Sequence, residues 1–332
     1  MHQTILPPRL TAGDTVRVVA PARSRALIME HDNTRWINER FAAMGLTLTF
    51  GAHVDEDDRF RSSSIESRVA DLHEAFADPE VAGILTVVGG FNSNELLPHL
   101  DWELIGANPK VFCGYSDITA LANAILTHTG LITYSGPHWS SFGMRDHFDP
   151  TGDWFRAAVM DDRPIELTAA STWTDDLWFL DQEDRHATPN PGWTVLQHGS
   201  ATGRIVGGNL CTLNLLQGTD HLPDLSGAVL FLEDDELSNP VEFARDLTSL
   251  LQLPGADTVS GLVIGRFQRA SQVSEEDLAE IVRRQPALRD KPVVCGLDFG
   301  HTMPMITFPI GGTATVETSR TDARITIGQP AA

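Results

Sequence analysis

Residues Lys110-Val-Phe-Cys-Gly-Tyr-Ser-Asp-Ile-Thr-Ala-Leu121 place a serine between an apolar run and a helix-like pattern. Residues 111–113 are typical of a short buried strand, Gly114 allows a sharp turn, and apolar residues follow at helical spacing over 118–126. We therefore predict Ser116 at a helix N-terminus, where backbone N–H groups can face an anion. Two roles stay open: a helix-capping serine, or a nucleophile beside an oxyanion site. Ile118 stands where a hydrolase G-x-S-x-G elbow has its second glycine.

The segments before this turn alternate between strand and helix patterns. We predict strands over 14–20, 47–50 and 81–88, helices over 28–44 and after a capping box at Ser63-Ser-Ile-Glu66, and partly helical structure over 96–104. Such alternation is typical of a doubly wound parallel sheet. Ligands of these sheets bind beyond the carboxyl ends of strands, and both the Gly89-Gly90 loop and the Ser116 turn fall there.

The second half of the chain begins with an irregular polar segment and then returns to alternating strand and helix patterns. Residues 149–199 are polar and rich in Trp and Pro, with little periodicity, so we predict a linker and the start of a second domain. Strands over 228–232, 261–267 and 292–297 and helices from Pro240 and over 274–284 follow. We therefore expect an α/β protein with an N-terminal, doubly wound, mostly parallel sheet domain (1–150), a Trp-rich linker (151–200) and a C-terminal α/β domain with a β-rich tail (201–332).

Composition excludes several classes of partner. The chain has 332 residues, a net charge of -21 and 42% hydrophobic residues, and no segment is rich in Lys or Arg. Nucleic acid polymers and anionic membrane surfaces are therefore poor candidates, whereas a few arginines could hold a small anionic ligand. The N-terminus lacks signal-peptide features and no apolar run approaches the ~18 residues of a membrane span, so we expect a cytoplasmic protein.

Cysteine and histidine spacing argues against a metal or a disulfide. Cys113, Cys211 and Cys295 are far apart, odd in number and in apolar surroundings, so we predict three buried free thiols. No H-x-x-H, H-E-x-x-H or Cys-pair spacing occurs. We expect no metal and no cofactor in the functional site.

Two other predicted strand ends carry groups that could activate a serine. Glu233-Asp-Asp-Glu236 follows one strand, and His301 follows Gly300 after another. By themselves these are more often a solvated, helix-capping acidic loop and a structural histidine. A serine hydroxyl, however, needs an imidazole to take its proton, and the imidazole needs an acid to fix its tautomer. Ser116, His301 and Glu233 could supply these three roles.

Five segments together resemble the LD-carboxypeptidase family of serine peptidases, over roughly residues 14–312. They are Gly89-Gly-Phe-Asn-Ser-Asn-Glu-Leu-Leu-Pro-His-Leu-Asp101, Gly114-Tyr-Ser-Asp-Ile-Thr-Ala-Leu121, Gly207-Gly-Asn-Leu210, Leu230-Phe-Leu-Glu-Asp234 and Gly300-His301. The resemblance implies a Ser-Glu-His triad, usually in a homodimer, with Ser116 as nucleophile, His301 as general base and Glu233 as the group that orients it. The backbone N–H groups of Gly90 and Asp117 would form the oxyanion hole.

The family has two branches with different substrates. One removes terminal D-alanine from murein tetrapeptides in cell-wall recycling, and the other, the microcin C self-immunity peptidases, cleaves the amide between an aminoacyl or peptidyl group and a nucleotide phosphoramidate. The glycine loop and the segment ending in Gly192-Trp193 resemble the second branch. That likeness implies that Trp178 stacks on the nucleobase, with Trp173 and Trp193 as alternatives, and that Asn209 hydrogen-bonds the substrate.

Three hypotheses follow for the function. The first is a serine hydrolase of aminoacyl-nucleotide amides, the second a murein LD-carboxypeptidase with the same triad, and the third a non-catalytic protein that binds a small ligand. The third predicts that Ser116, Glu233 and His301 need not converge. Asp235 and Glu236 leave open how an anionic phosphate is tolerated beside Glu233.

Overall fold

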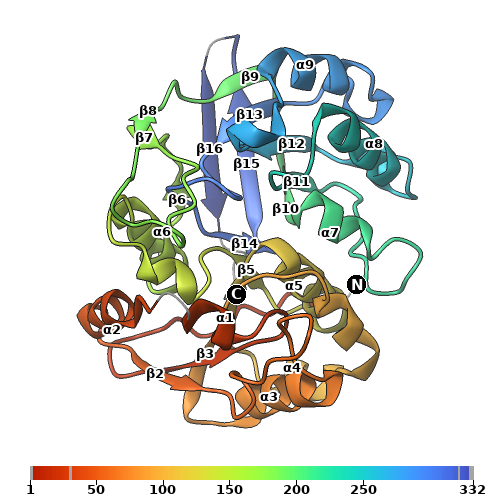
Figure 1. The fold of residues 1–332 in the computed structure, drawn as a ribbon. Helices are drawn as coiled ribbons and strands as arrows, with labels where there is room; N and C mark the ends of the chain where they lie inside the picture. The colour runs from red at the N-terminus through yellow and green to blue at the C-terminus, as the bar shows by residue number, and fades with distance from the viewer. Residues whose placement is uncertain (1–2, 30–31, 321, 329–332) are drawn as a thin grey trace.

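The described residues form two large β-sheets and a two-stranded ribbon, and Figure 1 shows the two large sheets one above the other with helices against each. The structure is a computed structural model and describes residues 3–29, 32–320 and 322–328. The first sheet has the strand order β14-β5-β4-β3-β1-β2, and only β14 runs antiparallel to its neighbour. Its strands are β1 (Thr15–Val19), β2 (Thr47–Phe50), β3 (Val81–Thr86), β4 (Val111–Gly114), β5 (Thr133–Ser135) and β14 (Phe308–Ile310).

Helices cover both faces of this sheet, as expected for a doubly wound fold. The helices are α1 (Arg25–Met29), α2 (Thr34–Ala43), α3 (Ile65–Ala77), α4 (Trp102–Ala107), α5 (Thr119–Thr129) and α6 (Asp149–Val159), with 3-10 turns η1 (Ser93–His99), η2 (Ser116–Ile118) and η3 (Ser140–Gly143). Phe76 of α3 and Leu121 of α5 belong to one buried cluster. Ile37 of α2 and Phe155 of α6 belong to another.

The second sheet has eight strands in the order β6-β16-β15-β10-β11-β12-β13-β9. Strands β10 to β13 are parallel, and the outer strands pair antiparallel. The strands are β6 (Ile165–Glu166), β9 (Thr194–Gln197), β10 (Gly199–Asn209), β11 (Val229–Glu233), β12 (Gly261–Gly265), β13 (Val293–Leu297), β15 (Thr313–Thr318) and β16 (Ala323–Gly328). The predicted fold class, including the β-rich tail, is therefore confirmed.

The remaining elements cover one face of the second sheet or form a small ribbon. They are α7 (Leu210–Asn214), α8 (Pro240–Leu251), α9 (Glu275–Arg283), η4 (Ala256–Thr258), η5 (Arg269–Ser271), η6 (Pro286–Leu288), and β7 (Thr172–Trp173) paired with β8 (Thr188–Pro189). Asn239 caps α8 ahead of Pro240, as predicted. None of the helices in the described part of the chain is long and apolar enough to cross a membrane.

The two sheets share a core. Ile125 of α5 and Leu213 of α7 lie in the same buried cluster, so the helix that follows Ser116 packs on the half that carries the second sheet. Strand β14, which comes from the C-terminal tail, pairs with β5 of the first sheet. The packing of α5 on α7 and the pairing of β14 with β5 fix how the strand ends of the first sheet lie relative to those of the second. The domain boundaries at 150 and 200 stay a prediction.

Three local predictions were wrong. The helix predicted over 28–44 is two helices, because Asp32 accepts hydrogen bonds from the N–H and hydroxyl of Thr34 (2.9 and 2.6 Å) and starts α2 there. The predicted capping box is replaced by a simple N-cap one residue later, where the Ser64 hydroxyl accepts from the N–H of Ser67 (3.0 Å). The segment after 149 begins with a regular helix, α6, although we expected little periodicity.

The prediction that all three cysteines are buried was wrong for one of them. Cys113 and Cys295 are buried and free, but Cys211 is free and exposed. Leu210 and Leu213 turn the apolar side of α7 to the core, which leaves Cys211 on the solvent side of the helix.

Candidate functional site

Ser116 is the first residue of η2 and lies in a sharp turn directly after β4. Its φ of 58° is in the left-handed region, which costs a non-glycine residue roughly 1–3 kcal/mol. A strained strand-to-helix turn that exposes a serine is the geometry of a nucleophile elbow, here without the G-x-S-x-G sequence. The hydroxyl pairs with the imidazole of His301 (Oγ to Nε2, 3.1 Å). The structure therefore favours the nucleophile role over the helix cap.

Glu233 and His301 complete a chain of hydrogen bonds to this hydroxyl. His301 Nδ1 lies 2.7 Å from Glu233 Oε2, at the end of β11. Because an ionised carboxylate only accepts, Nδ1 donates to it, and the lone pair of Nε2 faces the Ser116 hydroxyl. The three side chains meet although 185 residues separate Ser116 from His301. This convergence contradicts the non-catalytic hypothesis.

Glycines make room for the buried carboxylate. Glu233 is 3% exposed. A Cβ on Gly300 would lie 2.5 Å from Glu233 Oε2, and one on Gly265 would lie 2.8 Å from Glu233 Cβ. Gly300 also has a φ of 99°, which L side chains rarely adopt. The Gly-His pair therefore lets the imidazole approach the acid closely.

The acidic loop raises the pKa of the imidazole. Burial lowers the pKa of His301, but the charge and hydrogen bond of Glu233, with the carboxylates of Asp235 and Asp234, outweigh burial and hold this pKa above 6.5. Burial, reinforced by Glu233, raises the pKa of Asp234 to about 7. Glu236 is exposed. Glu233 and Asp234 are both buried, so the interpretation as a wholly solvated acidic loop fails for these two.

The glycine loop after β3 is tied to the serine turn. Asp117 Oδ2 accepts hydrogen bonds from the N–H groups of Asn92 (3.1 Å) and Ser93 (2.9 Å). A Cβ on Gly89 would lie 3.0 Å from Ser116 Cβ and 3.1 Å from its Oγ, so this glycine keeps the space beside the hydroxyl open. Gly90 packs against Ala22 and Arg23 instead. The oxyanion role of the Gly90 and Asp117 N–H groups stays a prediction.

Sequence reasoning missed a second histidine at the site. His138 follows β5 and is 2% exposed, and its Nδ1 lies 2.8 Å from Thr86 Oγ1. Burial, with a smaller effect of His301, lowers the pKa of His138 to about 3, so this ring is neutral. The Tyr115 ring lies between the two imidazoles, with centroids 4.3 Å from His138 and 5.3 Å from His301. Ligands of such sheets bind just beyond the carboxyl ends of the strands, but this position of His138 can be recognised only once β5 is placed beside β4.

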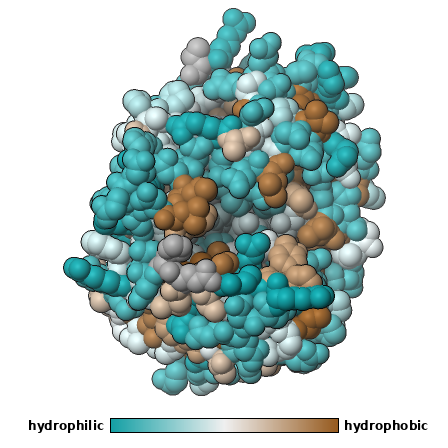
Figure 2. Space-filling view, in the orientation of Figure 1, coloured by the Kyte–Doolittle hydropathy of each residue, from teal (hydrophilic) through white to brown (hydrophobic). Residues whose placement is uncertain are grey.

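A cavity of about 360 Å³ opens at His301, with Tyr115 and His138 in its wall. Trp178 lines it, together with apolar side chains that include Leu27, Ile37, Val88, Leu177 and Met303. Figure 2 shows apolar side chains near the centre of the face turned to the viewer, between the parts of the molecule that carry the first and the second sheet.

The other two tryptophan candidates lie elsewhere. Trp173 stacks under the guanidinium groups of Arg266 (5.0 Å) and Arg269 (4.3 Å) and lines a separate, smaller cavity. Trp193 packs against the apolar cluster of the second sheet. Trp178 is thus the candidate that shares a cavity with His301.

Asn209 has structural partners at both ends of its side chain. Its Oδ1 accepts from the N–H of Thr212 (2.9 Å) and caps α7, and its Nδ2 donates to Asp234 Oδ1 (3.2 Å). A substrate contact of Asn209 stays a prediction. Among the described residues, one group of three side chains could hold a metal ion, namely His128, Asp220 and His221. This group lies at the C-terminal end of α5, far from Ser116.

Family models match most of the chain. The model of the LD-carboxypeptidase N-terminal domain matches residues 16–136, and that of the LD-carboxypeptidase C-terminal domain matches residues 202–316. The first contains Ser116, and the second contains Glu233 and His301.

Curated relatives match over nearly their whole length. A provisionally named carboxypeptidase of Bacillus subtilis (strain 168), YocD, is 47% identical over 96% of this chain and 98% of its own. The microcin C7 self-immunity protein MccF of Escherichia coli is 31% identical (93% and 92%). The murein tetrapeptide carboxypeptidase of Pseudomonas aeruginosa (strain PAO1) is 27% identical (92% and 94%).

Solved structures have the same fold. An MccF-like protein from Bacillus anthracis (strain Ames) superposes with a TM-score of 0.96 at 48% identity, over 98% of this chain and 100% of that one. MccF in complex with aspartyl sulfamoyl adenosine superposes with a TM-score of 0.87 at 29% identity, over 98% of both chains.

Proposed function

Because the chain is a serine hydrolase that belongs to the LD-carboxypeptidase family, we propose that it hydrolyses the amide joining an aminoacyl or peptidyl group to a nucleotide phosphoramidate. Ser116, His301 and Glu233 form its catalytic triad in this proposal. The biological role is self-immunity or detoxification of the kind that microcin C requires.

The triad performs the reaction in two steps. Ser116 Oγ attacks the carbonyl carbon while His301 Nε2 takes its proton, and the N–H groups of Gly90 and Asp117 stabilise the oxyanion. The C–N bond then breaks, and His301 returns the proton to the leaving nitrogen. A water molecule, deprotonated by the same imidazole, then attacks the acyl-Ser116 ester, and His301 returns that proton to Ser116 Oγ as the acid leaves. Glu233 stabilises the imidazolium throughout.

The cavity beside His301 is the observation that carries the substrate class. Its wall combines the Trp178 ring with aliphatic side chains, which suits a flat nucleobase better than a short charged peptide. Arg23 also lines this cavity, and we propose that its guanidinium pairs with the anionic phosphoramidate and offsets the nearby carboxylates. The likeness to MccF, whose complex holds aspartyl sulfamoyl adenosine, supports the same class.

Two substrates tested side by side separate the proposal from the murein alternative. The enzyme is incubated with an aminoacyl sulfamoyl adenosine and, separately, with a murein tetrapeptide that ends in D-alanine. We expect release of the amino acid from the first at a much higher kcat/KM than release of D-alanine from the second. The reverse order would assign the enzyme to the murein branch.

Replacing Trp178 by alanine tests the nucleobase contact. Stacking of a base on an aromatic ring contributes about 1–3 kcal/mol, so KM for the aminoacyl nucleotide should rise about tenfold or more with a smaller change in kcat. Trp178→Phe should keep most of the affinity. Trp173→Ala is the matched control, because Trp173 stacks on arginines outside this cavity. An equal effect of both alanine substitutions would remove the stacking assignment.

The pH profile tests the ionisation of His301. The general base must be neutral and its pKa lies above 6.5, so kcat/KM should be low in acid and rise as pH passes that pKa. Asp235→Asn removes a carboxylate that raises this pKa, and the acid limb should move to lower pH. Glu236→Gln, a change in the exposed neighbour, is the control. An acid limb that stays in place in Asp235→Asn would contradict the electrostatic account.

The assembly and location of the protein are also proposals. We propose a cytoplasmic homodimer, as the family resemblance implies. Light scattering of the purified protein should give twice the chain mass, and cell fractionation should recover the protein with cytoplasmic markers.

A further inference from the structure

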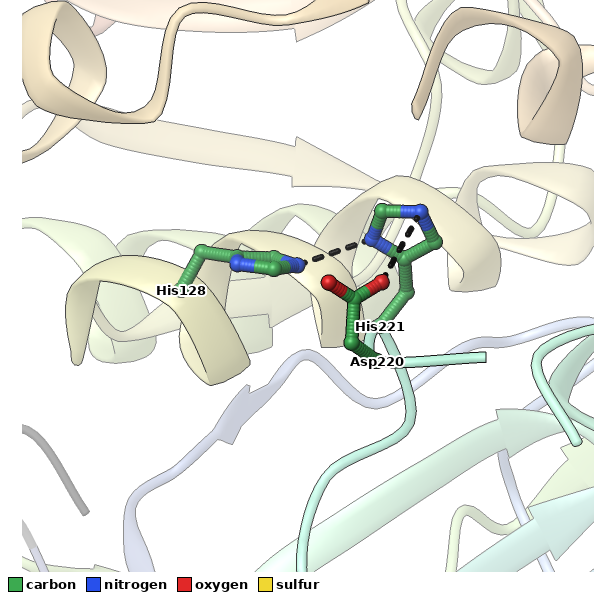
Figure 3. A group of neighbouring side chains, drawn as sticks. All are labelled: His128, Asp220 and His221. Carbon is green, nitrogen blue, oxygen red and sulfur yellow. Dashed lines mark hydrogen bonds and ion pairs between the residues drawn. The ribbon is translucent and has the colours of Figure 1, made fainter. Parts of the chain in front are cut away.

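His128 and His221 face each other at a place far from Ser116. One comes from a helix beside the first sheet and the other from a loop that leads into the second. His128 lies in the last turn of α5, and His221 lies in the loop between α7 and β11. Figure 3 shows their rings pointing toward one another, with the carboxylate of Asp220 beside them. His128 Nε2 lies 2.8 Å from His221 Nδ1, and the three residues offer ligand atoms within 4.8 Å of one another.

The spacing of the two nitrogens suits a shared metal ion. Two imidazole nitrogens at about 2.1 Å from a metal lie about 3.0 Å apart at right angles and about 3.4 Å apart at the tetrahedral angle that Zn²⁺ prefers, so the two rings must separate by a few tenths of an ångström. Asp220 Oδ1, which lies 3.6 Å from His221 Nε2, must also turn toward Nδ1 of that ring. Trp102 stacks on His128 (4.4 Å between ring centroids, 14° between planes) and holds that ring in orientation. Without a metal, the pair needs a proton between its nitrogens. A metal ion would replace that proton and use both lone pairs.

We propose that His128, His221 and Asp220 bind a divalent first-row transition metal ion such as Zn²⁺ or Ni²⁺. Two imidazoles and one carboxylate favour these ions over Mg²⁺ and Ca²⁺, which prefer oxygen ligands. The net charge of -21 favours cation binding in general. Asp220 is mostly exposed, so water molecules complete the coordination.

The ion acts as a brace between the halves and takes no part in hydrolysis. His128 comes nine residues after Thr119, the first residue of α5, and at 1.5 Å per residue this places the metal about 14 Å along the helix from the serine turn. The ligands join α5, beside the first sheet, to the loop that leads into β11 of the second. Since Ser116 belongs to one half and Glu233 to the other, the ion stabilises the arrangement in which they meet.

Calorimetric titration of the tag-free, chelator-treated protein with Zn²⁺ and Ni²⁺ tests the site. We expect one equivalent to bind, and His128→Gln and His221→Gln each to weaken binding by at least about tenfold. His198→Gln, a change in an exposed histidine elsewhere, should bind like the parent. Zn²⁺ should also raise the unfolding temperature of the parent and the control, but not of the two histidine variants.

Asp220→Asn keeps the test independent of folding defects. The Asp220 side chain is 84% exposed, so this variant should keep the parent's metal-free unfolding temperature while it binds Zn²⁺ more weakly. Well below the unfolding temperature, hydrolysis by the parent should be unchanged after chelation, because the ion stabilises the folded state but contacts neither the triad nor the substrate. Unchanged Zn²⁺ affinity in both histidine variants, or no binding by the parent at millimolar Zn²⁺, would overturn the proposal.

Discussion

Turnover of the aminoacyl-nucleotide amide is expected to fall by about 10⁴- to 10⁶-fold when Ser116 is replaced by alanine. The substitution removes the atom that attacks the carbonyl, while the cavity and the proposed oxyanion donors remain. KM should change little, because the hydroxyl contributes to the reaction and not to holding the nucleotide. Single-turnover kinetics at saturating substrate measure the loss.

The same variant should fold normally. Alanine meets the same left-handed backbone cost at φ 58° that serine does, so the free energy of unfolding should stay close to that of the parent. Ser140→Ala is the matched control, because Ser140 lines the cavity beside His301 but has no bond to His301 among those described. A Ser116→Ala protein that hydrolyses the substrate at the parental rate would rule out the serine mechanism.

Glu233→Gln should lower kcat by about 10⁴-fold, the cost seen when the acid of a serine triad becomes an amide. The amide NH₂ can face Nδ1 of His301 as a donor, which moves the imidazole proton to Nε2 and takes the lone pair away from Ser116. The variant also loses the charge that stabilises the imidazolium. Steady-state kinetics, together with circular dichroism to check folding, measure this effect.

The neighbouring acid provides the control for Glu233. Asp234 is also buried, but its hydrogen bonds go to Asn209 and to the N–H of Asp235 and not to His301. Asp234→Asn should therefore lower kcat far less than Glu233→Gln. If Asp234→Asn were the more damaging change, the acid of the triad would be Asp234.

The sequence predicted the site correctly where a local pattern of residues marks it. The apolar run before Gly114 and the helical spacing after Ile118 predicted a strand-to-helix turn at Ser116, and the structure has β4, η2 and α5 there. Glu233 and His301 were candidates because each follows a predicted strand, and the family resemblance then gave them their roles. No local pattern reports that the ends of β11 and β13 face the end of β4, because that contact depends on how the two sheets pack.

Other features had no usable signal in one sequence. His138 follows a short strand inside a nearly continuous buried run, so nothing distinguishes it from a core residue until β5 is placed beside β4. The break between α1 and α2 depends on side-chain bonds of Asp32, which apolar spacing does not register. The pairing of His128 with His221 joins residues 93 positions apart and became visible only when α5 and the loop after α7 were placed.

Covalent labelling tests the central claim that one serine is activated by His301. The intact protein is treated with a fluorophosphonate, which reacts with activated serine hydroxyls, and the adduct is located by mass spectrometry of peptides. We predict one adduct per chain, on the peptide that contains Ser116, with none in Ser116→Ala and much slower labelling in His301→Gln. An adduct on a different residue, or labelling of Ser116 at the same rate without the imidazole, would contradict the account.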